Sequence, residues 1–506
     1  MCGIFGIISA EGIAPGGLSV VAADGLTALQ HRGTESSGLV GSNGVHRDHF
    51  EIVKGTGLVR DVYSDENLCT FRDSIAILGH NRYSTAGMKT AINCVQPFVV
   101  HTTVGLMAIA HNGELVNANR KRNEILHSGV GLSTDTDSEL IAQIISKSVA
   151  STMQHRRDES NYGDISKELA ATMFSLTTSY SLLVMTYDRI YAVRDPYGNR
   201  PLCAGVMYSP LYSPPNNAEL RKPLAYIAAS ESCAIESVAE LKCEVEPGEI
   251  IEISRSGIRS VHQRSLMRRS IKMSEDRLQM KPAKPAFCIF EYVYFARADS
   301  ILEGRQVQSV REECGRILAE ESFIDADVVS TVPDSATAAS IGFAKKSGIR
   351  YEQVLHRNGY VGRSFIQPNT ELRQKTVHKK FGVIRESVEK KRIILIDDSI
   401  VRGNTMSIIV SMLRACGAKE VHLRIASPPL KHPCFMGINI PSKSELIAAN
   451  FTVDEICKQL GADSVRYLSI EGLKRAVIGG LVRQADKKIG HCTACLSGEY
   501  PAKLEW

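Results

Sequence analysis

The stretch IILIDDSIVRGNT, residues 393–405, carries the sharpest structural signal in the sequence. Its apolar start predicts a buried strand, Asp397 and Asp398 follow at the carboxyl end, and a loop with Gly403 leads to a helix that opens at Thr405. Ligands of open α/β sheets bind outside the carboxyl ends of the strands, and the first turn of a helix offers free backbone N–H groups to a phosphate. The stretch therefore predicts a binding site at a strand-to-helix junction.

The chemistry of this junction differs from that of a Walker loop, because no lysine follows Gly403. Two adjacent carboxylates suit the hydroxyls of a sugar or a hard cation such as Mg²⁺. A strand that ends in polar residues before a helix cap would explain a single acid pair, but it does not explain the whole stretch in this order. We expect a sugar with a phosphate on one side and a metal-bound pyrophosphate on the other.

Strand and helix patterns alternate around this stretch, which is typical of a parallel, doubly wound sheet. The residues before about 255 instead show short strands and turns with few helical stretches. Between the two regions lies a basic segment with few apolar residues, which we interpret as a solvated connector. The predicted organisation is a first domain over 2–255, a connector over 256–284, a second domain over 285–480 and a C-terminal tail over 481–506.

Composition narrows the function classes. The 506 residues carry a net charge of +5, which is too mild to indicate nucleic-acid binding. No apolar run approaches the roughly 20 residues that span a bilayer, and the start does not match a secretory signal. The thirteen cysteines are expected to be thiols in a reducing compartment. We expect a cytoplasmic protein that binds neither nucleic acid nor a membrane.

The chain begins MCGIFGI, with a thiol at its second residue. Removal of Met1 before the small residue Cys2 would place a thiol and a free α-amino group on one residue. The amine has a pKa of about 8, so it can serve as a base near neutral pH. A buried strand cysteine is the alternative. We predict that Cys2 is a nucleophile that needs no histidine and that the mature chain begins at Cys2.

Further residues would complete a site for glutamine. Arg82 follows a predicted strand and can pair with a substrate carboxylate. Asn112 and the backbone N–H of Gly113 are candidate oxyanion donors, and Asp137 can receive an ammonium group. Taken singly, each has another explanation: a surface ion pair for Arg82, a hairpin turn for Asn112 and Gly113, and a helix N-cap for Asp137.

Taken together, the first half resembles class II glutamine amidotransferase domains, which have an N-terminal-nucleophile (αββα) fold. The resemblance rests on the initial Cys-Gly-Ile and on three motifs in the family's order: QHRGTES (30–36), NRYSTAG (81–87) and AHNGELVN (110–117). One departure is Thr34, where the family motif has Gln. The resemblance implies an α+β domain in which Cys2 attacks glutamine.

The stretch 393–405 resembles the signature of type I phosphoribosyltransferases, which bind 5-phosphoribosyl-1-pyrophosphate (PRPP). This implies an α/β domain with a mostly parallel, doubly wound sheet, in which Asp397 and Asp398 meet the ribose and its Mg²⁺. By the same resemblance, Ser335 lies near the Mg²⁺. The residues implied to cradle the 5-phosphate are Ser399, Ile400, Val401, Arg402, Gly403, Asn404 and Thr405.

The two halves in this order resemble the amidophosphoribosyltransferase family of purine biosynthesis. Four further motifs match that family: RDPYGNRPL (194–202), FEYVYFAR (290–297), YVGRSFIQP (360–368) and GINIPS (437–442). Ala298 departs from the usual Pro. The resemblance implies that glutamine, PRPP and water give 5-phosphoribosylamine, glutamate and pyrophosphate, with ammonia channelled between two sites. It also implies a mobile loop that brings Arg363 to the pyrophosphate, a homotetramer, and feedback inhibition by purine nucleotides.

A C-x-x-C pair lies near the carboxyl end in HCTACLSGEY (491–500). Alone it is a weak signal, open to zinc, redox chemistry or chance. In a subset of the same family, four cysteines in matching places hold a [4Fe–4S] cluster, which implies Cys288, Cys434, Cys492 and Cys495 as ligands. A four-cysteine set suits zinc equally well on chemistry alone. Resemblance therefore selects iron, in a structural role.

Two other function classes were weighed. An amidotransferase that makes glucosamine 6-phosphate or asparagine would share the first half but lack the 393–405 stretch. A regulatory homologue that senses PRPP without catalysis would keep that stretch and lose the glutamine site. The intact Cys2, Arg82, Asn112 and Asp137 argue against the regulator.

Overall fold

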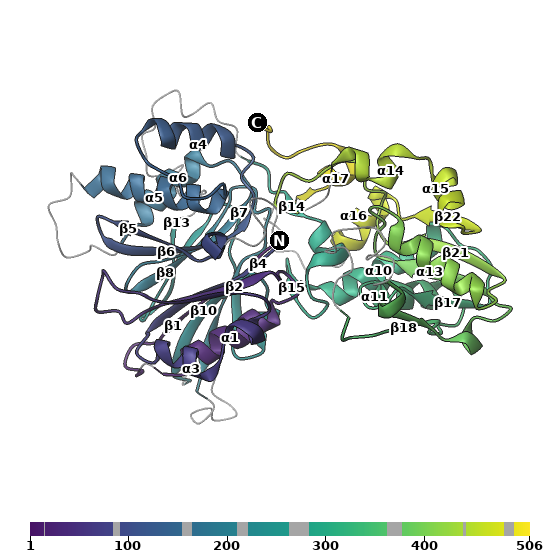
Figure 1. The fold of residues 1–506 in the computed structure, drawn as a ribbon, viewed down its shortest axis with the longest axis horizontal. Coiled ribbons are helices and arrows are strands. Elements are labelled where there is room, and N and C mark those ends of the chain that lie inside the picture. The colour runs from purple at the N-terminus through teal and green to yellow at the C-terminus, as the bar shows by residue number, and fades with distance from the viewer. Residues whose placement is uncertain are drawn as a thin grey trace.

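The computed structural model places two halves side by side, with the N-terminus between them (Figure 1). The residues that it describes are 1–14, 16–83, 92–153, 164–209, 221–262, 283–361, 377–438, 442–479 and 490–505. Among these residues, no helix is long and apolar enough to cross a membrane.

Two antiparallel sheets stack face to face in the first half. In the described residues, the seven-stranded sheet has the order β11 (Glu240–Glu244), β9 (Cys203–Tyr208), β10 (Pro223–Ala229), β1 (Gly3–Ser9), β4 (Ala76–Arg82), β2 (Ser36–Ser42) and β3 (Glu51–Thr56). The six-stranded sheet, counted over the same residues, has the order β13 (Gly257–His262), β12 (Ile250–Ser254), β8 (Arg189–Arg194), β7 (Tyr180–Met185), β6 (Gly105–Gly113) and β5 (Phe98–Thr102).

Helices cover the outer faces of both sheets, which gives the predicted αββα arrangement (Figure 1). The seven-stranded sheet is covered by α1 (Leu18–Ala28) and α7 (Cys233–Glu236), and the six-stranded sheet by α5 (Asp137–Met153) and α6 (Ser166–Ser175). The remaining helices of this half are α2 (Val59–Val62), α3 (Asp65–Leu68) and α4 (Ala118–His127). One apolar core lies between the sheets, and one lies under each helix layer.

Strand β1 is buried throughout because its two faces pack into different cores. Ile4 and Ile8 enter the core between the sheets, whereas Phe5 and Ile7 pack under α1. A Cβ at Gly25 of α1 would lie 2.3 Å from the Phe5 ring, so the helix reaches the strand only without a side chain there. This burial on both faces fixes the strand and with it the position of Cys2.

The second half contains the parallel sheet that the strand–helix alternation predicts. Over the described residues its order is β17 (Val328–Thr331), β20 (Arg392–Asp397), β21 (Glu420–Ile425) and β22 (Ser464–Tyr467). One face is covered by α10 (Val307–Glu321), α11 (Thr337–Ser347) and α16 (Ile470–Ile478), and the other by α13 (Asn404–Ala415) and α15 (Val453–Leu460). Strand β20 therefore has core residues on both sides, as the apolar run 393–396 predicts.

Shorter elements complete the second half and connect it to the first. They are β14 (Phe287–Cys288), β15 (Ile301–Leu302), β16 (Arg305–Gln306), β18 (Leu355–Arg357), β19 (Phe381–Val383), α14 (Ile447–Asn450), β23 (His491–Cys492) and α17 (Ala494–Ser497). Met1 belongs to the apolar core of the second half, so the N-terminus packs against both halves. Strand β13 pairs with β12 as far as His262, so the six-stranded sheet continues past residue 255.

Candidate functional site

Cys2 lies immediately before β1, at the junction of the two halves (Figure 1). Its backbone N–H donates to Oδ1 of Asn112 over 3.2 Å, and its thiol donates to the carbonyl of Tyr83 over 3.7 Å. Burial raises the pKa of the Cys2 thiol, whereas the positive N-terminus and the Arg82 guanidinium lower that pKa. The predicted nucleophile is therefore half-buried with the Arg82 guanidinium beside it, and burial lowers the pKa of the neighbouring N-terminal amine to about 5.

The two predicted oxyanion donors lie at the end of β6. Nδ2 of Asn112 is buried and has no hydrogen-bond partner among the described residues. Glu114 and Ser179 exchange both backbone hydrogen bonds, at 2.9 and 2.8 Å. In an antiparallel ladder, hydrogen-bonded pairs alternate with pairs that exchange no hydrogen bonds. Gly113 and Tyr180 form the next pair, so the N–H of Gly113 points away from β7. An amide donor and a backbone N–H are thus both available beside Cys2.

Arg82 and Asp137 also meet at this site, since both act on the charge of Cys2. Arg82 ends β4 and is 5% exposed. Asp137 opens α5, and its Oδ2 accepts the N–H of Leu115 over 2.9 Å. The structure therefore gathers around Cys2 all four residues that the sequence predicted to bind glutamine.

A buried ion network beneath Cys2 joins the two halves, and sequence reasoning missed it. Nη1 and Nη2 of Arg32 contact the carboxylate of Glu291 at 3.1 and 3.0 Å, and Nη1 also pairs with Glu231. Nε of Arg32 donates to the carbonyl of Cys2 over 3.0 Å, and Arg200 lies 3.3 Å from Glu291. Burial would raise the pKa of Glu231, but His31 and Arg32 outweigh burial and hold that pKa far below its usual range.

The sequence signal that could have revealed this network is that three of the motifs contain a charged residue. Arg32 belongs to QHRGTES, Arg200 to RDPYGNRPL and Glu291 to FEYVYFAR. All three side chains are fully buried. A motif arginine that is buried needs a buried acid, but the sequence does not say which one.

The predicted acid pair lies at the carboxyl end of β20. Oδ1 of Asp398 accepts the hydroxyl of Ser335 over 2.5 Å, and its Oδ2 accepts the hydroxyl of Ser399 over 2.6 Å. Burial raises the pKa of Asp397, and the neighbouring Asp398 raises it further. Burial also raises the pKa of Asp398, against the lowering effect of the two serines. Two adjacent carboxylates with raised pKa values, the half-buried Asp397 and the buried Asp398, form a site that a cation would stabilise.

The loop after the acids turns into α13 as predicted, with the helix beginning at Asn404. Gly403 has φ +82°, which favours glycine, and a Cβ there would lie 2.8 Å from Ile447. Ile400 is buried in the core, whereas Asn404 and Thr405 are exposed at the helix start. The open first turn can therefore present its N–H groups to an anion.

Other residues of the loop are held by the segment before α15. The carbonyl of Val401 accepts the N–H of Ile447 over 3.0 Å, and Nε of Arg402 donates to Glu445 over 2.7 Å. Arg363, predicted to reach the pyrophosphate, lies outside the described residues.

The four predicted cluster cysteines come from three separate segments and share one region. Pairing of β14 with β23 sets Cys288 opposite Cys492. The N–H of His432, two residues before Cys434, donates to the carbonyl of Cys495 over 3.1 Å. Burial raises the pKa of Cys495, and the other three thiols raise it further. In the described part of the chain, however, no three His, Cys, Asp or Glu side chains have the arrangement of a metal site.

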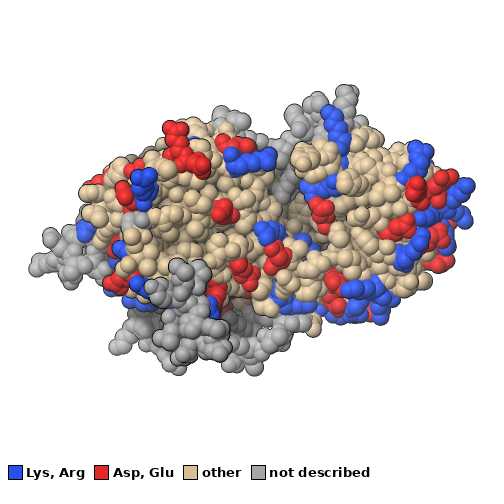
Figure 2. Space-filling view, turned by 90° about the horizontal axis from the view of Figure 1, so that it is seen from below, with Lys and Arg blue, Asp and Glu red and all other residues tan. Residues whose placement is uncertain are grey.

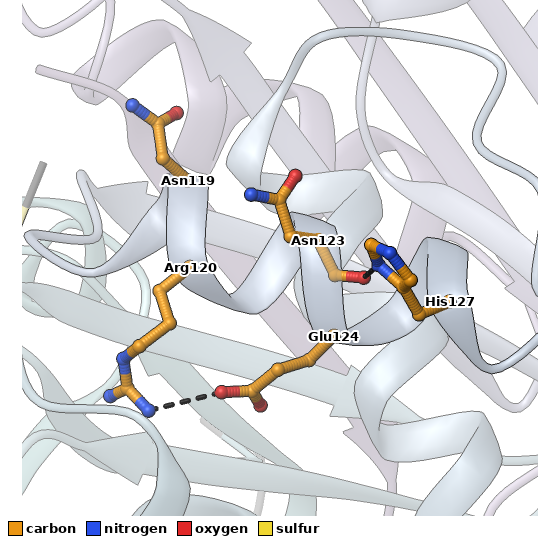
Figure 3. A pocket seen from close by; sticks show the side chains of 5 residues that line it. All are labelled: Asn119, Arg120, Asn123, Glu124 and His127. Carbon is orange, nitrogen blue, oxygen red and sulfur yellow. Dashed lines mark hydrogen bonds and ion pairs between the residues drawn. The ribbon is translucent and has the colours of Figure 1, made fainter.

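The surface hollow on α4 and the charged surface residues differ from these sites in their composition. A hollow on α4 is lined by Asn119, Arg120, Asn123, Glu124 and His127, all from that one helix (Figure 3). Figure 2 shows basic and acidic side chains interspersed over the visible face of the second half. Charged side chains of the second half also form ion pairs, as Arg392 does with Asp325 and Asp327 at 2.8 and 3.0 Å.

Comparisons with known proteins agree with this arrangement. A family model described as a glutamine amidotransferase domain matches residues 80–211. The amidophosphoribosyltransferase of Mus musculus is 48% identical over 100% of this chain and 98% of its own length, and that of Archaeoglobus fulgidus is 41% identical over the same shares.

A solved structure covers the whole chain as well. It is glutamine PRPP amidotransferase from B. subtilis complexed with ADP and GMP, with 36% identity and a TM-score of 0.81 over 100% of this chain and 98% of that one. The two-domain architecture, an N-terminal-nucleophile domain followed by a phosphoribosyltransferase domain, is therefore shared along the full length. From the joint match of sequence, fold and site, the chain belongs to the amidophosphoribosyltransferase family.

Proposed function

We propose that this chain catalyses the reaction of its family in two sites: glutamine, PRPP and water give 5-phosphoribosylamine, glutamate and pyrophosphate. The observation that carries the proposal is that one apolar core contains both Met1, next to the half-buried Cys2, and Ile396 of β20, two residues before the buried Asp398. Formation of 5-phosphoribosylamine is the first committed step of purine biosynthesis. The limits at 284 and 480 remain part of the proposal, whereas the first domain extends past 255 because β13 ends at His262.

In the glutaminase site, Cys2 attacks the side-chain amide carbon of glutamine. The C–N bond breaks, ammonia leaves with a proton from the thiol, and water then cleaves the thioester to glutamate. With Met1 removed, the α-amine of Cys2 holds the thiol proton and faces Oδ1 of Asn112, the present partner of the Cys2 N–H. Nδ2 of Asn112 and the N–H of Gly113 stabilise the oxyanion.

The two charged groups of glutamine, its α-carboxylate and its α-ammonium, bind side chains of opposite charge. Arg82 receives the substrate α-carboxylate and Asp137 its α-ammonium. Because both residues act on Cys2, they hold the substrate with its side chain directed at the thiol.

In the second site, ammonia displaces pyrophosphate from the anomeric carbon of PRPP. Asp397 and Asp398 hold the ribose hydroxyls, and residues 399–405 bind the 5-phosphate through backbone N–H groups. The acid pair fits Mg²⁺, because both carboxyl groups have raised pKa values and the hydroxyl of Ser335 donates to Asp398. A bound Mg²⁺ would neutralise charge on the pyrophosphate. Arg363 is proposed to bind the pyrophosphate as well.

The four cysteines fit a [4Fe–4S] cluster by their chemistry, since four thiols from three segments gather in one buried region. Cys288, Cys434, Cys492 and Cys495 would hold it, and the cluster would cross-link the tail to the second domain. Iron analysis of anaerobically purified protein tests this. We expect bound iron in the wild type, a loss of it in Cys492→Ser, and no change in Cys69→Ser, which alters an exposed thiol. Iron-free, fully active wild type would contradict the assignment.

Regulation and assembly belong to the same proposal. The B. subtilis structure contains ADP and GMP, which supports purine nucleotides as feedback inhibitors of this chain. A homotetramer is also proposed. A reducing compartment such as the cytoplasm fits the thirteen free cysteines.

Substitution of Cys2 tests the two-site function. Cys2→Ala is expected to abolish glutamine-dependent synthesis and to retain synthesis from added ammonia, because the second site is separate. Cys69→Ala serves as the control and should retain both activities. Loss of both activities in Cys2→Ala, at an unchanged unfolding temperature, would contradict the two-site mechanism.

A further inference from the structure

A loop of the second half presses its backbone directly on the predicted oxyanion donor of the first half. Gly437 has φ +88° and lies against Gly113. A Cβ added to Gly437 would lie 2.7 Å from C, 2.9 Å from Cα and 3.0 Å from O of Gly113. Real side chains do not approach backbone atoms this closely, so the contact exists only because residue 437 is glycine.

The same peptide is held from its other side. A Cβ on Gly113 would lie 2.0 Å from the carbonyl oxygen of Ser179. Ser179 in turn donates its hydroxyl to Asn199 over 3.2 Å. Gly113 therefore lies tightly between Ser179, which immediately precedes β7, and Gly437, so Gly113 has no free space into which it could move if Gly437 shifted.

The loop that carries Gly437 is itself anchored to the first half. Nε of Arg200 donates to the carbonyl of Met436 over 2.8 Å, and its second terminal nitrogen contacts the same oxygen. Arg200 is fully buried and paired with Glu291. Met436 is also buried against Val116, which follows the oxyanion strand. These contacts fix the position of Gly437 against Gly113.

We propose that the Met436–Gly437 backbone is a positioning element of the glutaminase site, supplied by the other domain. It sets the direction of the Gly113 N–H and, through the preceding residue, of the Asn112 amide. Glutamine hydrolysis then depends on the seating of this loop, whereas synthesis from ammonia does not. The inference rests on the proposed oxyanion role of Asn112 and Gly113.

The test compares two glycine variants with matched backbone strain. Gly437→Ala adds a methyl group that must displace Gly113. Gly348→Ala in the same domain has φ +75° with no atom within 4 Å of the new Cβ, so it adds strain without a clash. We expect Gly437→Ala to lower kcat for glutamine hydrolysis by at least about tenfold, because misplacing one oxyanion donor costs about that or more. Ammonia-dependent synthesis should stay at the wild-type rate in both variants.

Two further measurements separate positioning from general damage. Alkylation of Cys2 by iodoacetamide needs no oxyanion donor, so its rate in Gly437→Ala should match the wild type. Should Gly437→Ala fail to fold, Arg200→Lys provides the second variant, since it keeps a cation beside Glu291 but loses the paired donors to Met436. It is expected to show the same selective loss.

The outcomes test the positioning role of Gly437 separately from the proposed function. Wild-type glutamine hydrolysis in Gly437→Ala or in Arg200→Lys would overturn the inference, as would an equal loss of both activities. Absence of glutamine hydrolysis in the wild type, or its survival in Cys2→Ala, would instead refute the proposed function.

Discussion

Replacement of Asn112 probes the oxyanion site most directly. Asn112→Ala removes Nδ2, a buried donor without a partner among the described residues, and also the Oδ1 that accepts the Cys2 N–H over 3.2 Å. Loss of one oxyanion donor costs about 2.7–4 kcal/mol, or about 10²–10³ in kcat. We expect a loss of this size in glutamine hydrolysis.

Asn112→Asp sharpens the test, because it keeps the shape and the acceptor but replaces the donor by a negative charge. Two like charges about 3.5 Å apart repel by about 5 kcal/mol at an effective dielectric constant of about 20. The Asp variant should therefore be at least as slow as the Ala variant.

The assay measures glutamate formation with PRPP present, and pyrophosphate release with ammonium chloride in place of glutamine. The second activity should be unchanged in both Asn112 variants. Asn119→Ala, on the exposed face of α4, is the matched control and should change neither activity. An Asp variant that hydrolyses glutamine at the wild-type rate would refute the assignment of Asn112 as an oxyanion donor.

Three further predictions concern other residues. Asp398→Asn should lower synthesis from both glutamine and ammonia at least about tenfold, since a buried charge-assisted contact is lost, whereas Asp325→Asn at the exposed ion pair should lower neither. Burial raises the pKa of Glu114 from its ordinary value of 4.5 to about 7. The folded state therefore binds the proton more tightly, and the free energy of unfolding falls by about 3 kcal/mol as the pH rises from 4.5 to 7. The unfolding midpoint of Glu114→Gln should not show this fall with pH. A variant whose midpoint falls with pH as steeply as that of the wild type would contradict the prediction. Arg32→Met should lower the free energy of unfolding by about 3–5 kcal/mol, because Glu231 and Glu291 lose a buried partner; denaturant titration checks this, and an unchanged midpoint would contradict it.

Local patterns were sufficient for the parts of the protein in which neighbours in sequence are neighbours in space. The stretch 393–405 forms β20, the phosphate loop and the start of α13 in the predicted order. Its apolar run reflects burial on both faces of a parallel sheet, and its turn needs a glycine at 403. Ala298, a departure from the family motif, contacts Gln308 through its backbone carbonyl at 2.8 Å, so the contact does not depend on its side chain.

Motifs also predicted the glutamine-site residues, because NRYSTAG and AHNGELVN each contain the end of a strand, and these two strands of the stacked sheets end beside Cys2. Asn112 at the end of β6 and Arg82 at the end of β4 both lie beside Cys2 for this reason. The sequence did not specify which atoms of these residues are free to act. The orphan Nδ2 of Asn112 and the direction of the Gly113 N–H follow only from the ladder that surrounds them.

The sequence by itself determined the two folds, and it predicted Cys2 as the nucleophile and residues 399–405 as the phosphate loop, since these depend on short-range patterns of burial, turns and charge. Only the tertiary structure decided which buried acids neutralise Arg32 and Arg200, and that Gly437 presses on Gly113. The physical reason is that burial makes a partner obligatory but leaves its position in the chain open. In this protein Arg200 lies 91 residues and Arg32 lies 259 residues from Glu291 in the chain, and the docking of the two domains brings them together.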